Sequence, residues 1–442
     1  MSQNPEGASL YCLDIRKKSL KSLGKSISGT FYPSPDGKYI YYLSLLGVSR
    51  FEISSGQSKS ISFSEEYEYD QSEERKYIFA HCWKEVSEKF YDASVHGIDW
   101  EGFKKNYEQF LPHIDNNYDF QDLLSEMLGE LNASHTGARY TPSSSPKLGY
   151  IGALFDDEYQ GKGLKIKEVL AGGILDNLTE AKAGDIIVSI DGKEIPEGSS
   201  WYEVFFRKAS KRTLLSIKEG RKTEDVYVTP GVSDSKLLYT RWVRRREQIV
   251  KELSGGRIGY VHVKGMNSES FREVFSNALG KYRNCEALIV DTRHNGGGWL
   301  HDDLASFLNG KAYIEFRPRG QYVGTEPYNK WTKPSCVLIG EDNYSDACGF
   351  PYVYRTLGIG KLIGAPVPGT MTSVWWETQV DHSLVFGIPE VTSWGLEEDC
   401  ALENFQIEPD IPVYNDPESL MRGEDKQLEA AVAEMLKEID AK

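Results

Sequence analysis

The sequence predicts a multi-domain α/β protein whose C-terminal part contains a mainly parallel β-sheet. The chain has 442 residues, which is long for one hydrophobic core and suggests about three domains. From residue 234 onward, continuous apolar runs alternate with helical patterns. This alternation is typical of buried parallel strands that are covered by helices on both faces. The segment 146–233 differs, because its short strand patterns are separated by glycine turns.

Residues 1–68 are predicted to form β-strands. The stretch 30–43, "TFYPSPDGKYIYYL", contains a Pro-Asp-Gly turn that leads into a strand, and a second strand follows at 47–53. The pattern resembles one blade of a β-propeller. A single blade cannot bury both of its faces, so two interpretations remain open. The segment is either the remnant of a larger propeller or a β-arm packed on the rest of the chain.

Residues 69–145 are predicted to be helical, because large apolar residues recur there at helical spacing. The first helix is indicated by Tyr77, Phe79, Trp83, Val86 and Phe90. A third helix is expected over 120–131, with Gly137 as its stop signal. His135 would then lie at the end of a helix.

The segment 146–233 resembles a PDZ domain over its full length. Strands are expected at 148–152, 163–169 and 224–229, and the phrase "AGDIIVSIDGKEI" at 183–195 is its most specific part. PDZ domains bind extended peptides by adding a strand to a sheet edge. The resemblance therefore implies a peptide-binding or substrate-guiding module.

The segment 234–442 carries the predicted parallel sheet. Its strands and helices alternate, and a closing amphipathic helix is expected over 424–439. The expected strands are 257–263, 287–291 and 336–339, and the expected helices are 236–253, 268–281, 299–308 and 347–357.

Composition excludes several classes of function. The net charge of −15 argues against nucleic-acid binding, which needs clustered lysine and arginine. No run reaches the roughly 18 apolar residues of a membrane helix, and residues 1–15 contain no apolar core of a signal peptide. The six cysteines form no CxxC pair, so neither a zinc site nor a disulfide framework is expected.

Ser345 lies where a buried strand gives way to a helix, in "GEDNYSDACGF". A hydroxyl at this place is exposed above the sheet edge, and free N–H groups of the helix start favour a developing oxyanion. The G-x-S-x-G pattern of α/β-hydrolases is absent. Position alone leaves two roles open, a helix N-cap and a nucleophile, and the N-cap is the commoner one.

A glycine-rich loop, "DTRHNGGGW" at 291–299, directly follows another predicted strand. Three consecutive glycines let the backbone approach a substrate and turn N–H groups toward it. A phosphate-binding loop is the competing interpretation. The Gly-Lys-Ser/Thr ending and the G-x-G-x-x-G spacing are both missing, which disfavours it.

None of the eight histidines belongs to an HExxH motif. His301, followed by Asp302 and Asp303, could hold a metal, and His294 could join it. A charge cluster at a helix N-terminus explains these residues more simply, and no metal or other cofactor is expected. His135 stands in "NASHTG", where the residues alone leave a surface histidine as the simplest interpretation.

Six motifs in order resemble the tricorn family of serine peptidases and, more broadly, the C-terminal processing peptidases. They are "ELNASHTG", "GRIGYVHV", "ALIVDTRHNGGGW", "YSDACGF", "TLGIGKLIG" and "ALENFQIEPDIPV". The resemblance covers about residues 70–440, with a PDZ-like segment between the first and second motifs. It implies a ClpP/crotonase-like catalytic domain and hydrolysis of peptide bonds.

The family's catalytic roles transfer to matching positions of this chain. The resemblance implies that Ser345 is the nucleophile and His135 the general base, while Ser134 and Glu403 complete a Ser-His-Ser-Glu tetrad. This fits the chemistry, because a serine hydroxyl needs a neighbouring base, and that base needs an orienting group. The oxyanion donors would be the backbone N–H groups of Gly298 and Asp346.

Two departures from the family pattern concern substrate choice. The family has Ala-Gly before the nucleophile, whereas this chain has Asn343 and Tyr344, so Tyr344 is expected to narrow the approach to Ser345. The family's acidic selector for basic side chains falls on Phe316 here, with Glu315 beside it. An apolar preference is therefore the alternative to a basic one.

The resemblance also implies partners. Expected substrates are peptides or unfolded proteins, and the family forms a homo-oligomer, a hexamer. By family the compartment would be the cytoplasm, or the periplasm if a signal peptide had been removed. A catalytically inactive peptide-binding or scaffold protein remains the alternative function, and the changed loop at 343–344 motivates it.

Overall fold

The computed structural model describes residues 10–24, 30–44, 47–62, 68–142, 147–380 and 382–441. Residues 1–9, which carry most of the segment tested for a signal peptide, lie outside them. The chain divides into two compact units, Met1–Gln71 and Ser72–Lys442.

The first unit consists of antiparallel strands. Strands β1 (Leu10–Asp14) and β2 (Ser19–Gly24) pair with each other. A four-stranded sheet follows, formed by β3 (Thr30–Pro33), β4 (Tyr39–Ser44), β5 (Gly47–Glu52) and β6 (Ser58–Ile61). The predicted Pro-Asp-Gly turn joins β3 to β4, and the Gly37 N–H donates to the Ser34 carbonyl at 2.9 Å. Among the unit's described hydrophobic residues only Phe51 is buried, so its own core contributes little stability.

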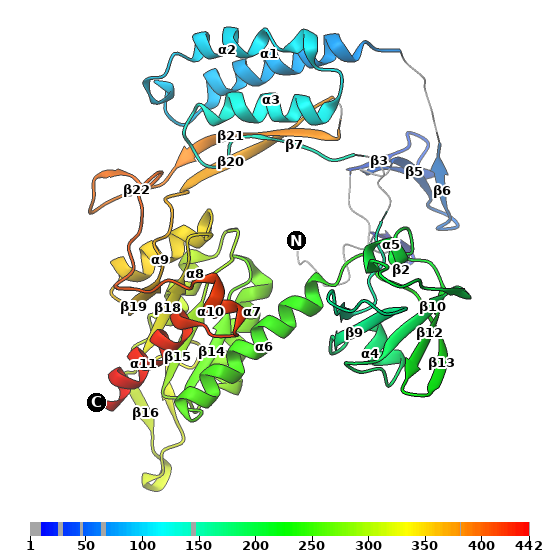
Figure 1. Ribbon diagram of the computed structural model, residues 1–442. Helices are drawn as coiled ribbons and strands as arrows, with labels where there is room; N and C mark the ends of the chain where they lie inside the picture. Colours follow the sequence, from blue (N-terminus) through cyan, green and yellow to red (C-terminus); the bar gives the residue numbers. More distant parts are fainter. Residues whose placement is uncertain are drawn as a thin grey trace. The chain divides into compact units, whose positions relative to one another are not determined.

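Three helices cover one face of a small antiparallel sheet in the second unit (Figure 1). The helices are α1 (Gln71–Lys89), α2 (Trp100–Glu108) and α3 (Asn117–Gly129), with short 3₁₀ turns at Val95–Gly97 and Leu111–His113. The sheet has the order β20 (Thr372–Thr378), β21 (Leu384–Thr392) and β7 (Ala138–Tyr140). The helices were predicted, whereas the long hairpin β20–β21 from the C-terminal part was not.

Helix α3 ends earlier than predicted. Its last residue is Gly129, because the chain tightens into 3₁₀-type bonds and then reaches Asn132 in the left-handed region at φ +47°. Gly137, the predicted stop, has φ +103° and precedes β7 instead. The prediction that His135 lies at a helix end was therefore wrong, since it lies in the loop between α3 and β7.

Residues 147–233 contain a separate antiparallel sheet. Its order is β13 (Lys222–Val228), β12 (Thr213–Glu219), β10 (Ile186–Ile190), β9 (Leu164–Val169) and β8 (Ala153–Phe155), with β11 (Lys193–Glu194) paired to β10. Two short helices, α4 (Ile174–Leu178) and α5 (Trp201–Phe205), accompany the sheet. The strand expected at 148–152 begins at Ala153, and Tyr150 forms only an isolated bridge with Gly231.

The C-terminal part is built on a five-stranded parallel sheet, which confirms the predicted mainly parallel sheet. The strand order is β14 (Ile258–His262), β15 (Ala287–Asp291), β18 (Ser335–Ile339), β19 (Lys361–Gly364) and β24 (Ile411–Pro412). Every neighbouring pair is parallel. β14, β15 and β18 are buried along their whole length, which is why they read as continuous apolar runs.

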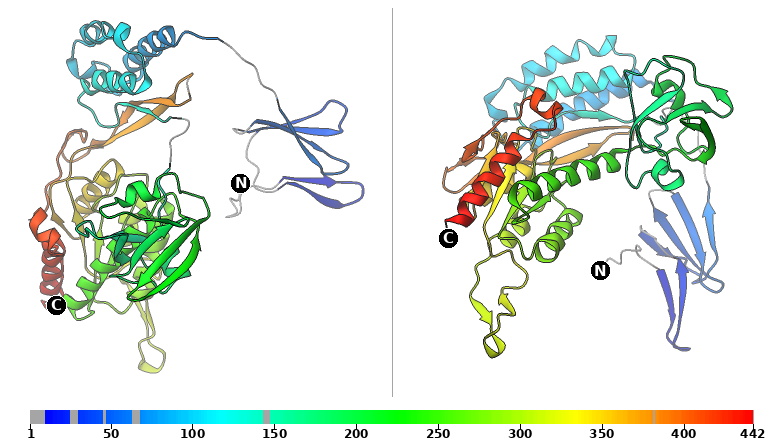
Figure 2. Two further views of the ribbon diagram at one scale, coloured as in Figure 1. Left: turned by 45° about the vertical axis from the view of Figure 1, so that its right-hand side comes forward. Right: turned by 60° about the horizontal axis from the view of Figure 1, so that its bottom comes forward.

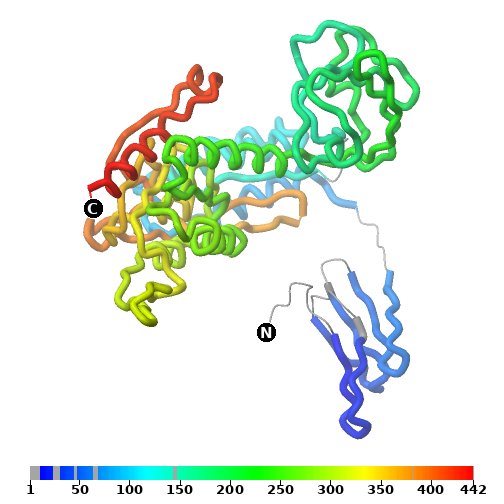
Figure 3. Tube along the Cα trace, turned by 90° about the horizontal axis from the view of Figure 1, so that it is seen from below, coloured from blue at the N-terminus to red at the C-terminus, as the bar shows by residue number. Residues whose placement is uncertain are grey.

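Helices cover both faces of this sheet. Helices α6 (Ser235–Ser254) and α11 (Lys426–Asp440) pack on one face, where alternate residues such as Ile289 and Leu338 point. Helices α7 (Ser268–Ser276), α8 (His301–Leu308) and α9 (Asp346–Thr356) pack on the other face. A π-helical turn, Asn277–Lys281, extends α7. Figure 3 shows α6 leading from the segment with the six-stranded antiparallel sheet into this parallel sheet and its helices.

The remaining elements are short. A hairpin of β16 (Ile314–Phe316) and β17 (Gly324–Glu326) projects from the body (Figure 2). A 3₁₀ turn (Pro318–Gly320), the pair β22 (Trp394–Gly395) and β23 (Cys400–Ala401), and α10 (Pro417–Met421) complete the unit. Within the described ranges, no helix is both long enough and apolar enough to cross a bilayer.

Candidate active site

Four of the residues to which the resemblance assigns catalytic roles line one cavity of about 470 Å³. They are His135, Gly298, Ser345 and Asp346. The other lining residues are largely apolar or hydroxyl-bearing: Trp299, His301, Gly349, Tyr352, Val353, Thr370, Met371, Thr372, Ser373, Val374, Ser393, Trp394 and Leu402. The cavity thus lies where the carboxyl edge of the parallel sheet meets the loop after α3 and the start of β20.

Ser345 occupies the N-cap position of α9 but does not act as a cap. Its side chain makes no capping hydrogen bond, and its backbone has φ +57° and ψ −129°. This conformation is rare for a residue with a side chain and costs about 1–3 kcal/mol. Strain of this kind is typical of a nucleophile on a sharp strand-to-helix turn. The structure therefore weakens the N-cap interpretation.

The loop before Ser345 is braced from below by Asn343, which is fully buried. Its side-chain amide donates to the Thr292 hydroxyl at 3.0 Å and to the Ala347 carbonyl at 3.1 Å. The Ser345 N–H donates to the Thr370 hydroxyl at 2.7 Å. These contacts hold the turn at the end of β18 in place. Asn343, which departs from the family pattern, therefore supports this loop.

Two of the three consecutive glycines are required by geometry. A Cβ on Gly297 would lie 2.5 Å from the Ser345 Cβ, and one on Gly298 would lie 2.0 Å from the Met266 carbonyl oxygen. Gly298 also has φ +144°, which side chains rarely adopt. Gly296 has open space around its Cβ position. Close approach to Ser345 therefore explains Gly297, and backbone conformation explains Gly298.

The N–H groups of Gly298 and Asp346 form no hydrogen bond among the described residues. Their neighbours are occupied: the Trp299 N–H donates to Met266, and the Ser345 N–H donates to Thr370. Two unpaired N–H groups beside a serine are the arrangement that can stabilise a developing oxyanion.

The Asp346 carboxylate connects the turn that carries Ser345 to the start of α8. It accepts from the Leu300 N–H at 2.5 Å and the His301 N–H at 3.1 Å, and it also contacts the His301 ring. This hydrogen bond raises the pKa of His301. The interaction holds the glycine loop, which precedes Leu300, in register with Ser345.

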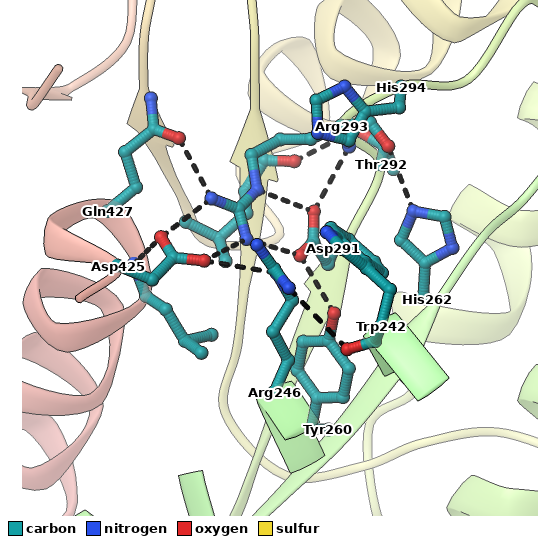
Figure 4. A network of polar contacts seen from close by, with 12 residues as sticks. Trp242, Arg246, Tyr260, His262, Asp291, Thr292, Arg293, His294, Asp425 and Gln427 are labelled. Carbon is teal, nitrogen blue, oxygen red and sulfur yellow. Dashed lines mark hydrogen bonds and ion pairs between the residues drawn. The ribbon is translucent and has the colours of Figure 1, made fainter. Parts of the chain in front are cut away.

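A buried network of ion pairs connects the end of β15 to the start of α11. Figure 4 shows Arg293 between Asp291 at the end of β15 and Asp425 before α11, at 2.7 and 2.8 Å. Burial alone would raise the pKa of Asp291, but the charge and hydrogen bonds of Arg293 lower it to about 2. The Tyr260 hydroxyl donates to Asp291 at 2.9 Å. The glycine loop therefore begins at residues whose charges are paired and buried.

The loop carrying His135 is held by contacts from distant segments. The Ser134 hydroxyl lies 2.8 Å from His135 Nδ1 and donates to Glu403 Oε2 at 3.0 Å. The Ser134 N–H donates to Glu403 Oε1 at 2.5 Å, and Glu403 is only 7% exposed. The structure thus brings Ser134, His135 and Glu403 into one hydrogen-bonded chain. Burial, and then the charge of Arg139, lowers the pKa of His135 from its usual value of 6.5.

Tyr344 packs directly on the imidazole. The two ring centroids are 4.8 Å apart, and the backbone N–H of His135 donates to the Tyr344 hydroxyl at 2.7 Å. No hydrogen bond between Ser345 and His135 is found in the part of the chain that the structure describes. Such contacts are often long without substrate.

None of the three residues predicted to influence substrate choice, Tyr344, Glu315 and Phe316, is among those that line the cavity. Glu315 and Phe316 lie on the projecting strand β16, and neither lines the cavity. Glu315 is paired with Arg317. Their role in specificity stays a prediction.

The metal alternative gains no support from the placement of its residues. The His294 ring contacts Asp342, whereas the His301 ring contacts Asp346. Among the described residues, the group with metal-ligand spacing is His81, Glu85 and Glu377. Lys89 forms ion pairs with both of these glutamates, so its charge partly neutralises theirs.

Sequence reasoning missed several residues that shape the site. Asn295 accepts from the Gly297 N–H at 2.9 Å and donates to the Val263 carbonyl at 2.7 Å. A Cβ on Gly387 in β21 would lie 2.3 Å from the His135 carbonyl oxygen. Thr370 and Thr372 contact Ser345 and His135. Asn295 stands inside the recognised glycine motif, while the other three carry no local signal.

Family models match two parts of the chain. Peptidase family S41 matches residues 257–413, and the tricorn protease C1 domain matches residues 71–129. The S41 match contains the glycine loop, Ser345 and Glu403, and the C1 match contains helices α1 to α3.

Curated relatives and solved structures give the same result. A putative tricorn-like protease C-terminal subunit of Sulfurisphaera tokodaii is 26% identical over 84% of this chain and 44% of its own length. The tricorn protease of Thermoplasma volcanium is 25% identical over 99% of this chain and 44% of its own length. A crystal structure of the tricorn protease matches with a TM-score of 0.83 and 22% identity, over 98% of this chain and 43% of that chain.

The chain therefore spans less than half the length of these relatives. The match to the crystal structure supports a tricorn-like fold, including the N-terminal strands, the helices and the parallel sheet. Taken together, the comparisons show that the chain is similar to tricorn proteases over most of its length and matches peptidase family S41 over residues 257–413.

Proposed function

We propose that this chain is a serine peptidase of the tricorn type that hydrolyses peptide bonds through an acyl-enzyme. Ser345 is the nucleophile and His135 the general base, with Ser134 and Glu403 orienting the imidazole. The N–H groups of Gly298 and Asp346 form the oxyanion hole. One observation carries the proposal: Ser345 and His135 line the same cavity as two unpaired backbone N–H groups.

The proposed reaction begins when His135 Nε2 takes the proton of the Ser345 hydroxyl as the oxygen attacks the carbonyl carbon. The carbonyl oxygen becomes an oxyanion and accepts from Gly298 and Asp346. His135 then gives the proton to the leaving amine, which leaves an ester on Ser345. A water molecule, deprotonated by His135, attacks this ester in the same way and releases the acid product.

The cavity walls favour an apolar side chain next to the cleaved bond. Among the described residues that line the cavity, Asp346 is the only one with a carboxylate, and it already accepts from two backbone N–H groups and contacts the His301 ring. A basic side chain would therefore find no free acid there. The apolar wall, formed by Val353, Met371 and Leu402 among others, instead stabilises apolar groups by removing them from water.

The segment 146–233 is proposed to be a PDZ domain that guides peptides toward this site. Its antiparallel sheet with two short helices supports the assignment, and strand addition would supply the peptide contacts. The proposed divisions are 1–68, 69–145, 146–233 and 234–442. Substrates are proposed to be peptides or unfolded proteins, and the active species a homo-oligomer.

Replacement of Ser345 by alanine tests the proposal. Hydrolysis of a mixed peptide library should fall by at least about 10⁴-fold, because losing a catalytic serine removes the covalent route. Ser276→Ala is the matched control, since Ser276 is exposed on α7 and should retain full activity. Thermal unfolding of both variants should match that of the wild type.

Full hydrolysis by the Ser345→Ala variant would contradict the proposal. If the wild type cleaved no library peptide and no fluorophosphonate reacted with Ser345, the inactive binding or scaffold function would be favoured instead. Mass spectrometry of the cleaved peptides would also test the proposed preference for apolar side chains.

A further inference from the structure

One short segment touches three parts of the candidate site. The Thr370 hydroxyl accepts from the Ser345 N–H at 2.7 Å, and the Met371 N–H donates to Glu403 Oε2 at 2.7 Å. The Thr372 hydroxyl lies 3.0 Å from His135 Nδ1. Thr372 is the first residue of β20 and is only 4% exposed. This segment therefore connects the nucleophile turn, the orienting carboxylate and the imidazole.

Two hydroxyl oxygens face the same nitrogen of His135. Ser134 Oγ is 2.8 Å from Nδ1 and Thr372 Oγ1 is 3.0 Å from it, and the two oxygens are 2.9 Å apart. Each hydroxyl has one proton to donate and two lone pairs to accept with. The direction of those two protons therefore decides the tautomer of the imidazole.

Both hydroxyl protons have other acceptors. The Ser134 hydroxyl donates to the Glu403 carboxylate, which is its strongest neighbouring acceptor, at 3.0 Å. The Thr372 hydroxyl donates to the Ser134 carbonyl at 3.2 Å. Lone pairs of both oxygens are then left for Nδ1, and this arrangement favours the tautomer with the proton on Nδ1. Nε2 keeps its lone pair, as a general base requires.

Ser134 alone cannot fix the direction of the imidazole, because it is the neighbour of His135 on the same loop. A movement of that loop would carry both residues together. Thr372 comes from β20, whose strand pairs with β21 over seven residue positions from Thr372 to Thr378. Its contact therefore relates the imidazole to a rigid sheet and, through Thr370, to the Ser345 backbone.

We propose that Thr372 is a positioning residue for His135, which holds the Nδ1–H tautomer and the ring orientation through its hydroxyl oxygen. The inference rests on the proposed function only in that it takes His135 to be the base. The hydroxyl should also stabilise the imidazolium, because a charged Nδ1–H forms stronger hydrogen bonds than a neutral one.

NMR titration of the His135 Cε1 resonance tests the proposal without relying on catalysis. His135→Gln assigns the signal among the eight histidines. Thr372→Val keeps the shape of the side chain and removes the hydroxyl, so the pKa of His135 should fall by about half a unit to one unit. Thr372→Ser keeps the hydroxyl and should restore the wild-type value. An unchanged pKa in the valine variant would overturn the proposal.

Thr392→Val is the matched control, because Thr392 pairs with Thr372 across the sheet and lies outside the cavity. It should leave the pKa of His135 unchanged, which separates the lost hydroxyl from a general disturbance of the hairpin. If Thr372→Val unfolds, Thr372→Ala provides the same deletion with less crowding. A pKa that also shifted in Thr372→Ser would indicate a packing role and contradict the proposal.

The rate of fluorophosphonate labelling of Ser345 gives a second readout. Thr372→Val should slow labelling by about 10- to 30-fold, and the midpoint of its acid limb should move to lower pH with the pKa of His135. Thr372→Ser should recover most of the rate. Failure of the wild type to label would contradict the proposed peptidase function, while the NMR result would still decide the role of Thr372.

Discussion

The two sides of the candidate site are built in different ways. The nucleophile side consists of the loops after β15 and β18, neighbouring strands of one buried parallel sheet. The base side consists of the loop after α3, with Glu403 and Thr372 bonded to it from positions more than 200 residues later. The proposed nucleophile and oxyanion groups are thus held by loops of the sheet, whereas the proposed base is held by hydrogen bonds between separate segments.

This difference indicates how each side can be disturbed. The nucleophile side depends on backbone shape: two required glycines, a strained Ser345 and a buried ion network around Arg293. The base side depends on a few polar atoms around Glu403 and Ser134. Single-atom changes should therefore affect the base side most, and added side-chain volume should affect the nucleophile side most.

Two variants distinguish the base side from the nucleophile side, and Glu403→Gln should lower the reaction rate more than the other, Gly298→Ala. The carboxylate accepts from the Ser134 N–H, the Ser134 hydroxyl and the Met371 N–H. An amide would turn a donor toward one of them and remove the charge that stabilises the imidazolium. Labelling of Ser345 by a fluorophosphonate should slow by about 10³- to 10⁴-fold, and the pKa of His135 should fall.

Glu408→Gln is the control for this change, because Glu408 is exposed on the same segment and should label at the wild-type rate. An unchanged labelling rate in Glu403→Gln would show that the base does not depend on this carboxylate. Equal losses in both variants would indicate a general effect of charge on the segment.

Gly298→Ala should have the next largest effect, and it should act on the nucleophile side alone. Its Cβ would meet the Met266 carbonyl oxygen at 2.0 Å in a backbone conformation with φ +144°. The loop must shift, which removes one oxyanion donor and lowers the hydrolysis rate by about 10²- to 10³-fold. The pKa of His135, measured by NMR, should stay at the wild-type value.

Gly296→Ala is a closely matched control, since a Cβ there meets no atom within 4 Å. Its hydrolysis rate should stay close to that of the wild type. If Gly296→Ala lost as much activity as Gly298→Ala, the whole loop rather than the Gly298 N–H would be responsible. A shifted His135 pKa in Gly298→Ala would show that the two sides are not independent.

The nucleophile side could be predicted closely from the sequence. The strand expected at 287–291 has the same bounds as β15, and the strand expected at 336–339 begins one residue later than β18. The helices expected at 299–308 and 347–357 differ from α8 and α9 by at most two residues at either end. Continuous apolar runs and glycine loops are local signals, so a strand-loop-helix unit is visible within about ten to fifteen residues.

The base side could not be predicted from local patterns. His135 and Ser134 were identified by resemblance alone. The third helix was expected to end at residue 131, with Gly137 as its stop signal, whereas α3 ends at Gly129 and Asn132 already adopts the left-handed conformation. The hairpin β20–β21 was missed. The proposed role of Thr372 depends on its contacts with Ser134 and His135, which are distant in the sequence. The residue pattern around Thr372 does not predict these contacts.

Fluorophosphonate labelling of Ser345 as a function of pH tests the central claim most directly, with mass spectrometry to locate the adduct. A base must be neutral to accept a proton, and burial lowers the pKa of His135. The labelling rate should therefore rise with pH through a midpoint below 6.5, and His135→Gln should abolish this dependence together with nearly all labelling. No adduct on Ser345, or an unchanged rate and pH profile in His135→Gln, would contradict the claim that these two residues form a catalytic pair.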